Sequence, residues 1–130
     1  MTTILLDTHA FLWLQTTPEK LEPVLNILED AETTLLLSAI SSWEIAVKWE
    51  LGKLELPEPP ERFVPDRMQR NGIEGLAVLH THALGVANLP RHHRDPFDRM
   101  LIAQALAEDI PLLTGDDAIR AYDVEVMWVG

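Results

Sequence analysis

Residues 1–14 of the chain read MTTILLDTHAFLWL. Ile4, Leu5 and Leu6 form a continuously apolar run, which is typical of a strand buried on both faces of a parallel sheet. Asp7 follows this run directly. A buried carboxylate is costly unless it is hydrogen-bonded, paired with a cation or bound to a metal. The fold and the function of this chain therefore depend on which of these partners Asp7 has.

The rest of the chain repeats this pattern of short apolar strands followed by helices. Strands are predicted at 3–6, 33–38, 75–79, 111–114 and 124–129. Helices are predicted at about 8–15, 19–31, 40–51, 61–71, 81–88, 97–109 and 116–121. Such alternation indicates βαβ units. We therefore predict an α/β fold: one domain over residues 1–130, with a mostly parallel central sheet of about five strands and helices on both faces.

The composition excludes several classes of function. The chain has 130 residues, 47% of them hydrophobic, and no cysteine, which excludes disulfides, thiolate metal sites and thiol catalysis. There is no apolar run of about 18 residues and no recognisable signal peptide, so we expect a cytoplasmic protein without a membrane span. The net charge of −11 argues against a broad nucleic-acid-binding face and favours a basic partner or a cation site.

Four acidic residues are predicted to meet at one edge of the sheet. In open parallel sheets, ligands bind at the carboxyl ends of the strands. Asp7 ends the first strand, and Glu44 lies in the first turns of the helix after the second. Asp98 begins the helix before the fourth strand, and Asp116 follows that strand. The topology therefore places all four side chains at the same edge.

Each acid also has a local explanation. Asp7 could cap the helix that follows it. Glu44 could form an exposed i, i+4 pair with Lys48. Asp116, after Gly115, could belong to a turn and a helix cap. Each of these roles is adequate for one residue, but together they require four acids to meet at the ligand edge by accident.

Asp98 is the most informative of the four. Asp95 is predicted to cap the helix, with Pro96 at its first position. The helix face predicted to be buried consists of Leu101, Ile102, Ala105 and Leu106, which follow Asp98 by three, four, seven and eight residues. Asp98 therefore lies on the face that packs against the sheet. A residue that only capped the helix could face water instead.

A divalent cation would reconcile these positions. Clustered carboxylates repel one another and raise one another's pKa. Oxygen ligands suit Mg²⁺ or Mn²⁺, and two such ions can activate water and stabilise the leaving oxygen of a phosphoryl displacement. We therefore predict that Asp7, Glu44, Asp98 and Asp116 are catalytic metal ligands, with two ions bound at turnover.

The same residues give the chain a family resemblance that covers nearly its whole length. Its motifs are LLDTH at 5–9, SWEIAVK at 42–48 with LGKL at 51–54, LPRHHRDPFDRMLIAQA at 89–105, and TGD at 114–116. The sequence resembles the PIN-domain ribonucleases, specifically the VapC toxins of type II toxin–antitoxin systems. In that family the acidic cluster falls on the equivalents of Asp7, Glu44, Asp98 and Asp116.

The resemblance implies an activity and partners. It implies a Mg²⁺- or Mn²⁺-dependent endoribonuclease that is a homodimer and is neutralised by a cognate VapB antitoxin. Thr8, Ser38 and Thr114 are expected to hydrogen-bond the ligand carboxylates, and Asp95 is expected to be a cap or a similar supporting residue. The alternative is a catalytically silent PIN-like module that binds RNA or protein.

Two further surfaces are predicted. Candidate contacts to RNA phosphates are Lys48, Arg91, His92, His93, Arg94 and Arg99, and the alternative for the 91–94 cluster is a solvated loop. No zinc site is expected, because adjacent histidines point apart. Candidate contacts to the antitoxin are Phe11, Trp13, Ile45 and Trp49, on the assumption that Ile40, Trp43, Val47 and Leu51 form the inward stripe of their helix. The alternative is a pair of core helices covered by the segment 61–71.

Overall fold

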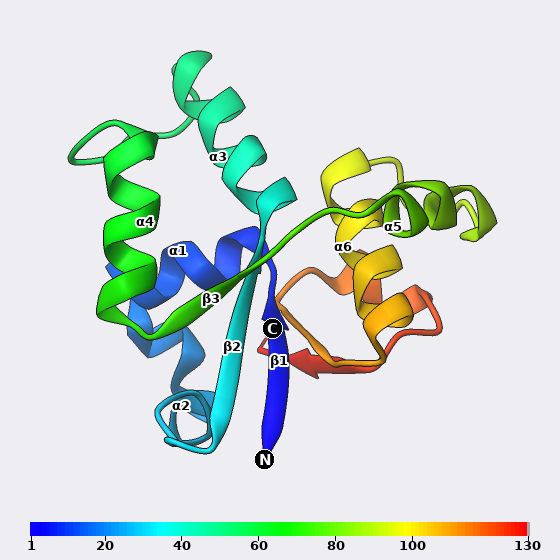
Figure 1. Ribbon diagram of the computed structural model, residues 1–130, viewed down its shortest axis with the longest axis horizontal. Coiled ribbons are helices and arrows are strands. Elements are labelled where there is room, and N and C mark those ends of the chain that lie inside the picture. Colours follow the sequence, from blue (N-terminus) through cyan, green and yellow to red (C-terminus); the bar gives the residue numbers. More distant parts are fainter. Residues whose placement is uncertain (130) are drawn as a thin grey trace.

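The computed structural model describes residues 1–129 and has a five-stranded sheet in the order β3-β2-β1-β4-β5 (Figure 1). The strands are β1 (Thr2–Leu6), β2 (Thr33–Ser38), β3 (Ile73–Leu76), β4 (Leu112–Thr114) and β5 (Val126–Trp128). Every neighbouring pair is parallel. The predicted α/β fold is confirmed, and the carboxyl ends of the strands meet at one edge.

The helices connect these strands. They are α1 (Thr8–Thr16), the 3₁₀ helix η1 (Pro18–Val24), α2 (Leu25–Leu28), α3 (Ala39–Glu50), α4 (Pro60–Arg70), α5 (His80–Gly85), η2 (Val86–Asn88), α6 (Pro96–Glu108) and η3 (Asp117–Ala121). Among the helices of residues 1–129, none has both the length and the apolar character needed to cross a bilayer.

Several element boundaries differ from the prediction, and two of the differences have a clear physical reason. The expected helix at 19–31 is divided into η1 and α2, because Pro23 lies inside it and lacks the N–H that a continuous α-helix requires. The third strand lies at Ile73–Leu76 and not at 75–79. Its partner β2 ends at Ser38, which pairs with Leu76, so no backbone remains for residues 77–79 to pair with.

The side chains of β1 alternate between two cores. Ile4 and Leu6 pack with residues of α1, η1 and α4, whereas Leu5 packs with residues of α6 and η3. Figure 1 shows α1 and α4 on one side of the strands and α6 on the other. This three-layer arrangement fixes β1 in the centre of the sheet, and Asp7 is thereby held where the two cores meet.

Helix α3 faces inward with a different stripe from the one predicted. Its buried residues are Ile40, Ser41, Glu44 and Ile45. Trp43 is 59% exposed and Leu51 is 61% exposed. The prediction was wrong because it assumed that the most apolar stripe is buried, whereas the polar contacts of Glu44 turn its own stripe inward.

Two of the predicted antitoxin contacts, Phe11 and Ile45, are core residues, although Ile45 also lines a pocket between α1 and α3. Both are fully buried, in the same cluster as Phe63 and Val64 of α4. The alternative of core helices covered by the segment 61–71 is correct for these two residues. Trp13 is partly buried, and Trp49 is 41% exposed, so these two members of the predicted set keep exposed side-chain surface.

Candidate metal centre

The local roles expected for the aspartates are all present. Oδ1 of Asp7 accepts a hydrogen bond from the Ala10 N–H at 2.7 Å and caps α1. Oδ1 of Asp116 accepts one from the Ala118 N–H at 2.9 Å and caps η3. Asp95 caps α6. Each cap uses one carboxylate oxygen, so these structural roles leave the second oxygen of Asp7 and Asp116 for another partner.

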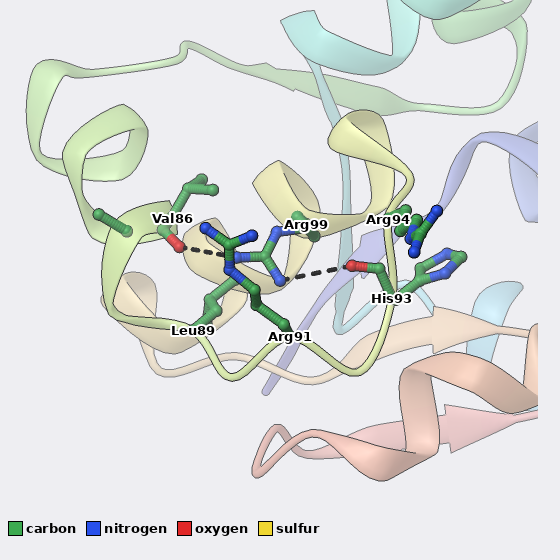
Figure 2. Close-up of a pocket in the computed structure, with 7 residues that line it drawn as sticks. Val86, Leu89, Arg91, His93, Arg94 and Arg99 are labelled. Carbon is green, nitrogen blue, oxygen red and sulfur yellow. Dashed lines mark hydrogen bonds between the residues drawn. The ribbon is translucent and has the colours of Figure 1, made fainter.

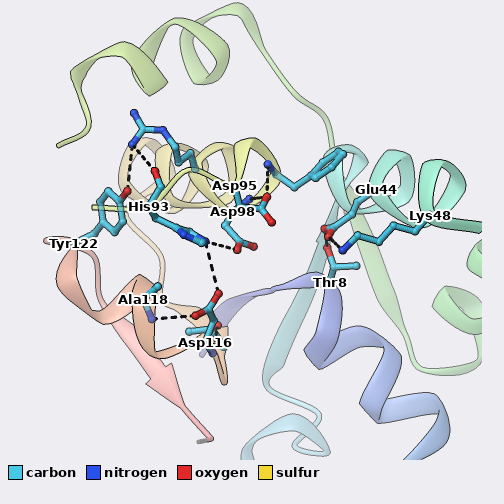
Figure 3. A network of polar contacts seen from close by, with 12 residues as sticks. Thr8, Glu44, Lys48, His93, Asp95, Asp98, Asp116, Ala118 and Tyr122 are labelled. Carbon is cyan, nitrogen blue, oxygen red and sulfur yellow. Dashed lines mark hydrogen bonds and ion pairs between the residues drawn. The ribbon is translucent and has the colours of Figure 1, made fainter. Parts of the chain in front are cut away.

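Asp98 and Asp116 come together around a histidine. Nε2 of His93 lies 2.8 Å from Oδ2 of Asp98 and 3.7 Å from Oδ2 of Asp116 (Figure 3). One ligand atom from each of these three residues lies within 4.8 Å of the other two. Across residues 1–129, this is the one group of three potential metal ligands that meets this distance.

His93 was predicted only as an RNA contact, and its place between the acids was missed. The sequence does signal that the two histidines diverge, and this is confirmed: the His92 ring packs edge-on against Tyr122, with ring centroids 5.1 Å apart. Which of the two turns toward Asp98 depends on the path of the loop before α6. That path is not readable from the spacing of residues.

Asp7 and Glu44 both lie outside this group of three, and Glu44 is held by its own contacts. Its Oε1 lies 2.6 Å from the Thr8 hydroxyl, which also lies 2.9 Å from the Ser41 hydroxyl. Its Oε2 accepts a hydrogen bond from Nζ of Lys48 at 2.6 Å. Burial lowers the pKa of Lys48, but its hydrogen bond to Glu44 and the nearby acids outweigh this and raise it. The predicted pair with Lys48 is therefore present, but Glu44 is buried and not exposed.

The acids nevertheless act on one another electrostatically. Burial raises the pKa of Asp7, the Thr114 hydroxyl and the Ala10 N–H oppose this, and the charge of Glu44 adds to it. Burial also raises the pKa of Asp98 to about 6, with further contributions from Asp95, Glu44 and Asp116, against the hydrogen bond from His93. The charge of Glu44 thus acts on both Asp7 and Asp98, and the charge of Asp116 acts on Asp98.

The donor set fits a divalent cation. Carboxylate oxygens with one imidazole nitrogen can bind Mg²⁺, Mn²⁺ or a similar ion. The three hydroxyl residues predicted to support the carboxylates have different roles. Thr8 contacts Glu44, Thr114 accepts a hydrogen bond from the Asp116 N–H and acts on Asp7, and Ser38 caps α3 through the Ile40 N–H. Ser38 therefore supports the backbone at the start of α3 and not a ligand carboxylate.

The predicted RNA-contact residues also divide. Arg91 and Arg94 are exposed and line a pocket of about 610 Å³ with His93 and Arg99 (Figure 2). Arg99 is already engaged: its guanidinium donates to the Val86 and Pro90 carbonyls at 3.1 and 2.9 Å. It donates also to the Tyr122 hydroxyl at 3.1 Å. Arg99 therefore holds the loop, whereas Arg91 and Arg94 are available for a ligand.

A smaller pocket of about 320 Å³ lies between α1, α3 and the loop that follows α3. Its apolar lining includes Leu12 and Leu54, and its basic lining includes Lys48 and Lys53. The pocket begins at Thr8, which contacts Glu44, so it adjoins the acidic edge of the sheet.

The fold and these contacts define an α/β protein with a cluster of acidic side chains at the carboxyl ends of its parallel strands. A family model for the PIN domain matches residues 4–125, and the chain belongs to the PIN domain family. This agrees with the resemblance that the sequence motifs carry.

Two curated relatives come from Mycobacterium tuberculosis. Ribonuclease VapC16 is 52% identical over 56 residues, and this match spans 43% of the chain and 40% of that protein. Ribonuclease VapC22 is 27% identical over 122 residues, or 94% of the chain and 93% of that protein. The stronger identity is thus confined to less than half of the relative, whereas the weaker one extends over nearly all of it.

Solved structures show the same fold. VapBC2 from Rickettsia felis, bound to a DNA fragment from its promoter, matches with a TM-score of 0.74 at 15% identity, over 97% of this chain and 98% of that one. DNA-bound VapBC from Salmonella typhimurium matches with a TM-score of 0.72 at 19% identity, over the whole of both chains. At such identities the likeness establishes the fold alone.

Proposed function

We propose that this chain, as one PIN domain over residues 1–130, is a metal-dependent endoribonuclease and the toxin of a type II toxin–antitoxin system. The observation that carries the proposal is the meeting of Asp98 and Asp116 around His93 at the carboxyl edge of the sheet, where the charge of Glu44 acts on both Asp98 and Asp7. Two curated relatives named as ribonucleases support the choice of substrate.

Asp7, Asp98 and Asp116 would hold Mg²⁺ or Mn²⁺, with Glu44 at the side of the site. When bound, such ions would activate water and stabilise the charge that develops on the scissile phosphate. Thr8 and Lys48 fix both carboxylate oxygens of Glu44, so this residue would orient a water molecule or come to a second ion only after exchanging a partner. The expectation of two ions at turnover stays a prediction.

The RNA would meet a local positive field despite the net charge of −11. Arg91 and Arg94 line the pocket beside His93, and Lys48 lies beside Glu44 on the other side. These side chains would contact the phosphates on either side of the scissile bond, whereas Arg99 keeps their loop in place. Single-stranded regions are the expected substrate, because their bases can be splayed.

A cognate VapB-type antitoxin would dock in the pocket between α1 and α3. Leu12 and Leu54 give that pocket an apolar floor, and Trp49 of α3 offers an exposed anchor nearby on the same helix. A segment bound there would extend toward Glu44 and could bring a basic side chain to the acids. The VapBC complexes with the same fold support this partner.

Two further parts of the proposal concern assembly and location. We propose a homodimer, in which a second copy would cover the exposed apolar side chains Trp43 and Leu51 of α3. Sedimentation of the wild-type chain and of Trp43→Glu tests this. A cytoplasmic location follows from the proposed RNA substrate and from no other observation.

The deciding experiment is cleavage of a single-stranded RNA by the purified chain with Mn²⁺ or Mg²⁺, with Asp116→Asn and Asp117→Asn as a matched pair. Asp116 faces His93, whereas the adjacent Asp117 is 86% exposed. We expect Asp116→Asn to lose at least about 100-fold in rate and Asp117→Asn to retain wild-type activity, with 5′-phosphate products. Cleavage that persists in excess EDTA, or 2′,3′-cyclic phosphate ends, would contradict the proposal. RNA binding without cleavage would identify the silent module instead.

A further inference from the structure

His93 occupies a position that the four-acid site does not explain. Its Nε2 lies 2.8 Å from Oδ2 of Asp98, which is a hydrogen-bond distance. The same nitrogen lies 3.7 Å from Oδ2 of Asp116. Its side chain is only 22% exposed, and Figure 3 shows the ring placed between the two carboxylates. One atom of one imidazole thus faces two acids that come from different elements.

The fold holds this ring in place from behind. The Arg99 guanidinium donates to the carbonyl oxygen of Pro90 and reaches the carbonyl oxygen of His93 itself at 3.5 Å (Figure 2). Asp95, two residues further, caps α6 and fixes where the loop ends. The neighbouring His92 turns to Tyr122 instead. The orientation of His93 toward the acids is therefore built into the loop.

The distances suit ligands of a single ion. Ligand atoms bound at about 2.1 Å from one ion can be at most about 4.2 Å apart. Nε2 of His93 meets this condition with both carboxylates, and the whole group of three lies within 4.8 Å. A small rotation of the carboxylates would complete the set.

We propose that His93 is a nitrogen ligand of the metal centre, beside Asp98 and Asp116, and that it makes the site favour Mn²⁺ over Mg²⁺. The inference rests on the proposed function, because it deepens the same site. Mg²⁺ is a hard ion that gains little from nitrogen, whereas imidazole is a good ligand for first-row transition metals. The imidazole nitrogen of His93, the one nitrogen in an otherwise oxygen-based site, would therefore make the site bind Mn²⁺ more tightly than Mg²⁺.

The test is pulsed electron paramagnetic resonance of Mn²⁺ bound to the full chain, with His93→Gln and His92→Gln as the matched pair. A directly bound imidazole adds ¹⁴N modulation to the Mn²⁺ spectrum. Glutamine keeps a polar side chain that can still bond to Asp98 but removes the imidazole. His9→Gln is included because His9 is the other histidine whose charge acts on a site acid, Asp7.

We expect ¹⁴N modulation in the wild type, His92→Gln and His9→Gln, and its loss in His93→Gln. Calorimetry should show Mn²⁺ affinity at least about 10-fold weaker in His93→Gln, with Mg²⁺ affinity changed by less than about 3-fold. Tight Mn²⁺ binding without ¹⁴N modulation in the wild type would overturn this inference and leave the proposed nuclease intact, as would modulation that survives in His93→Gln. Absence of any Mn²⁺ binding to the wild type would overturn both.

Discussion

Removal of the Asp98 charge should stabilise the metal-free protein. Burial and the neighbouring acids raise the pKa of Asp98 from 3.8 to about 6. The Asp98 carboxyl is therefore harder to ionise in the folded state than in the unfolded state. At a pH below both of its pKa values it is neutral in both states and costs the fold no stability. The cost grows as the pH rises between them and is complete above the higher one. At about 1.4 kcal/mol per pKa unit, it reaches about 3 kcal/mol at pH 8 and about half of that at pH 5.

Asp98→Asn is the variant that isolates this cost, because asparagine has a similar shape and its oxygen can still accept a hydrogen bond from His93. The Asp98 side chain is 16% exposed, so solvent screening reduces the effect only in part. We expect the free energy of unfolding to rise by about 1 to 3 kcal/mol at pH 8 in EDTA, and by less at pH 5. Urea unfolding followed by circular dichroism measures both.

Mn²⁺ should reverse the order of stability. It would bind the folded wild type and raise its free energy of unfolding by mass action, whereas Asp98→Asn should respond weakly. Asp117→Asn, at a position 86% exposed, is the control and should behave as the wild type throughout. If Asp98→Asn were less stable than the wild type at pH 8 in EDTA, or if its gain were the same at both pH values, the electrostatic reasoning would be refuted.

Three further outcomes are expected. Replacing both Arg91 and Arg94 with alanine should weaken RNA binding and flatten its dependence on salt, without changing Mn²⁺ affinity. If the variant binds RNA as tightly as the wild type at both low and high salt, the loop is only solvated. Arg99→Lys should lower the free energy of unfolding by about 1 to 3 kcal/mol, because an ammonium cannot replace the guanidinium hydrogen bonds to three separate acceptors. Urea unfolding measures this change. An unchanged free energy of unfolding would show that Arg99 does not hold the loop. Trp49→Ala should weaken binding of the proposed antitoxin by roughly 30-fold in calorimetry while leaving the fold intact, since Trp49 is 41% exposed; full affinity would place the antitoxin elsewhere.

The sheet and its acidic edge were predictable because they depend on local patterns. Short apolar runs located four of the five strands and displaced only β3, and a strand followed by a helix leads to a parallel sheet. Once the strands are parallel, a residue just after each strand must lie at the same edge. Asp7 and Asp116 follow from this rule alone, and Asp98 follows from its position on the inward face of α6.

The features that were missed depend on contacts between distant residues. Glu44 turns its stripe of α3 inward because Thr8, 36 residues earlier, bonds to it, and no helical periodicity contains that information. His93 faces the acids because Arg99 bonds to the carbonyls of Val86 and Pro90 and sets the path of the loop. Apolar periodicity predicts which surfaces are buried on average, but a buried polar network can override it.

The caps explain how the fold tolerates several acids in one place, and they determine which substitutions can test the site. The N-termini of α1, α6 and η3 all lie at this edge, capped by Asp7, Asp95 and Asp116. Their backbone N–H groups and helix dipoles stabilise negative charge before any cation is bound. Alanine at Asp7 or Asp116 would remove a cap together with a ligand, so a loss of activity would have two causes. Asparagine keeps the capping oxygen and removes only the charge, because it caps helices about as well as aspartate. A folded asparagine variant that has lost Mn²⁺ binding would therefore assign the carboxylate to the metal, whereas an alanine variant that has lost both stability and Mn²⁺ binding would assign it to neither.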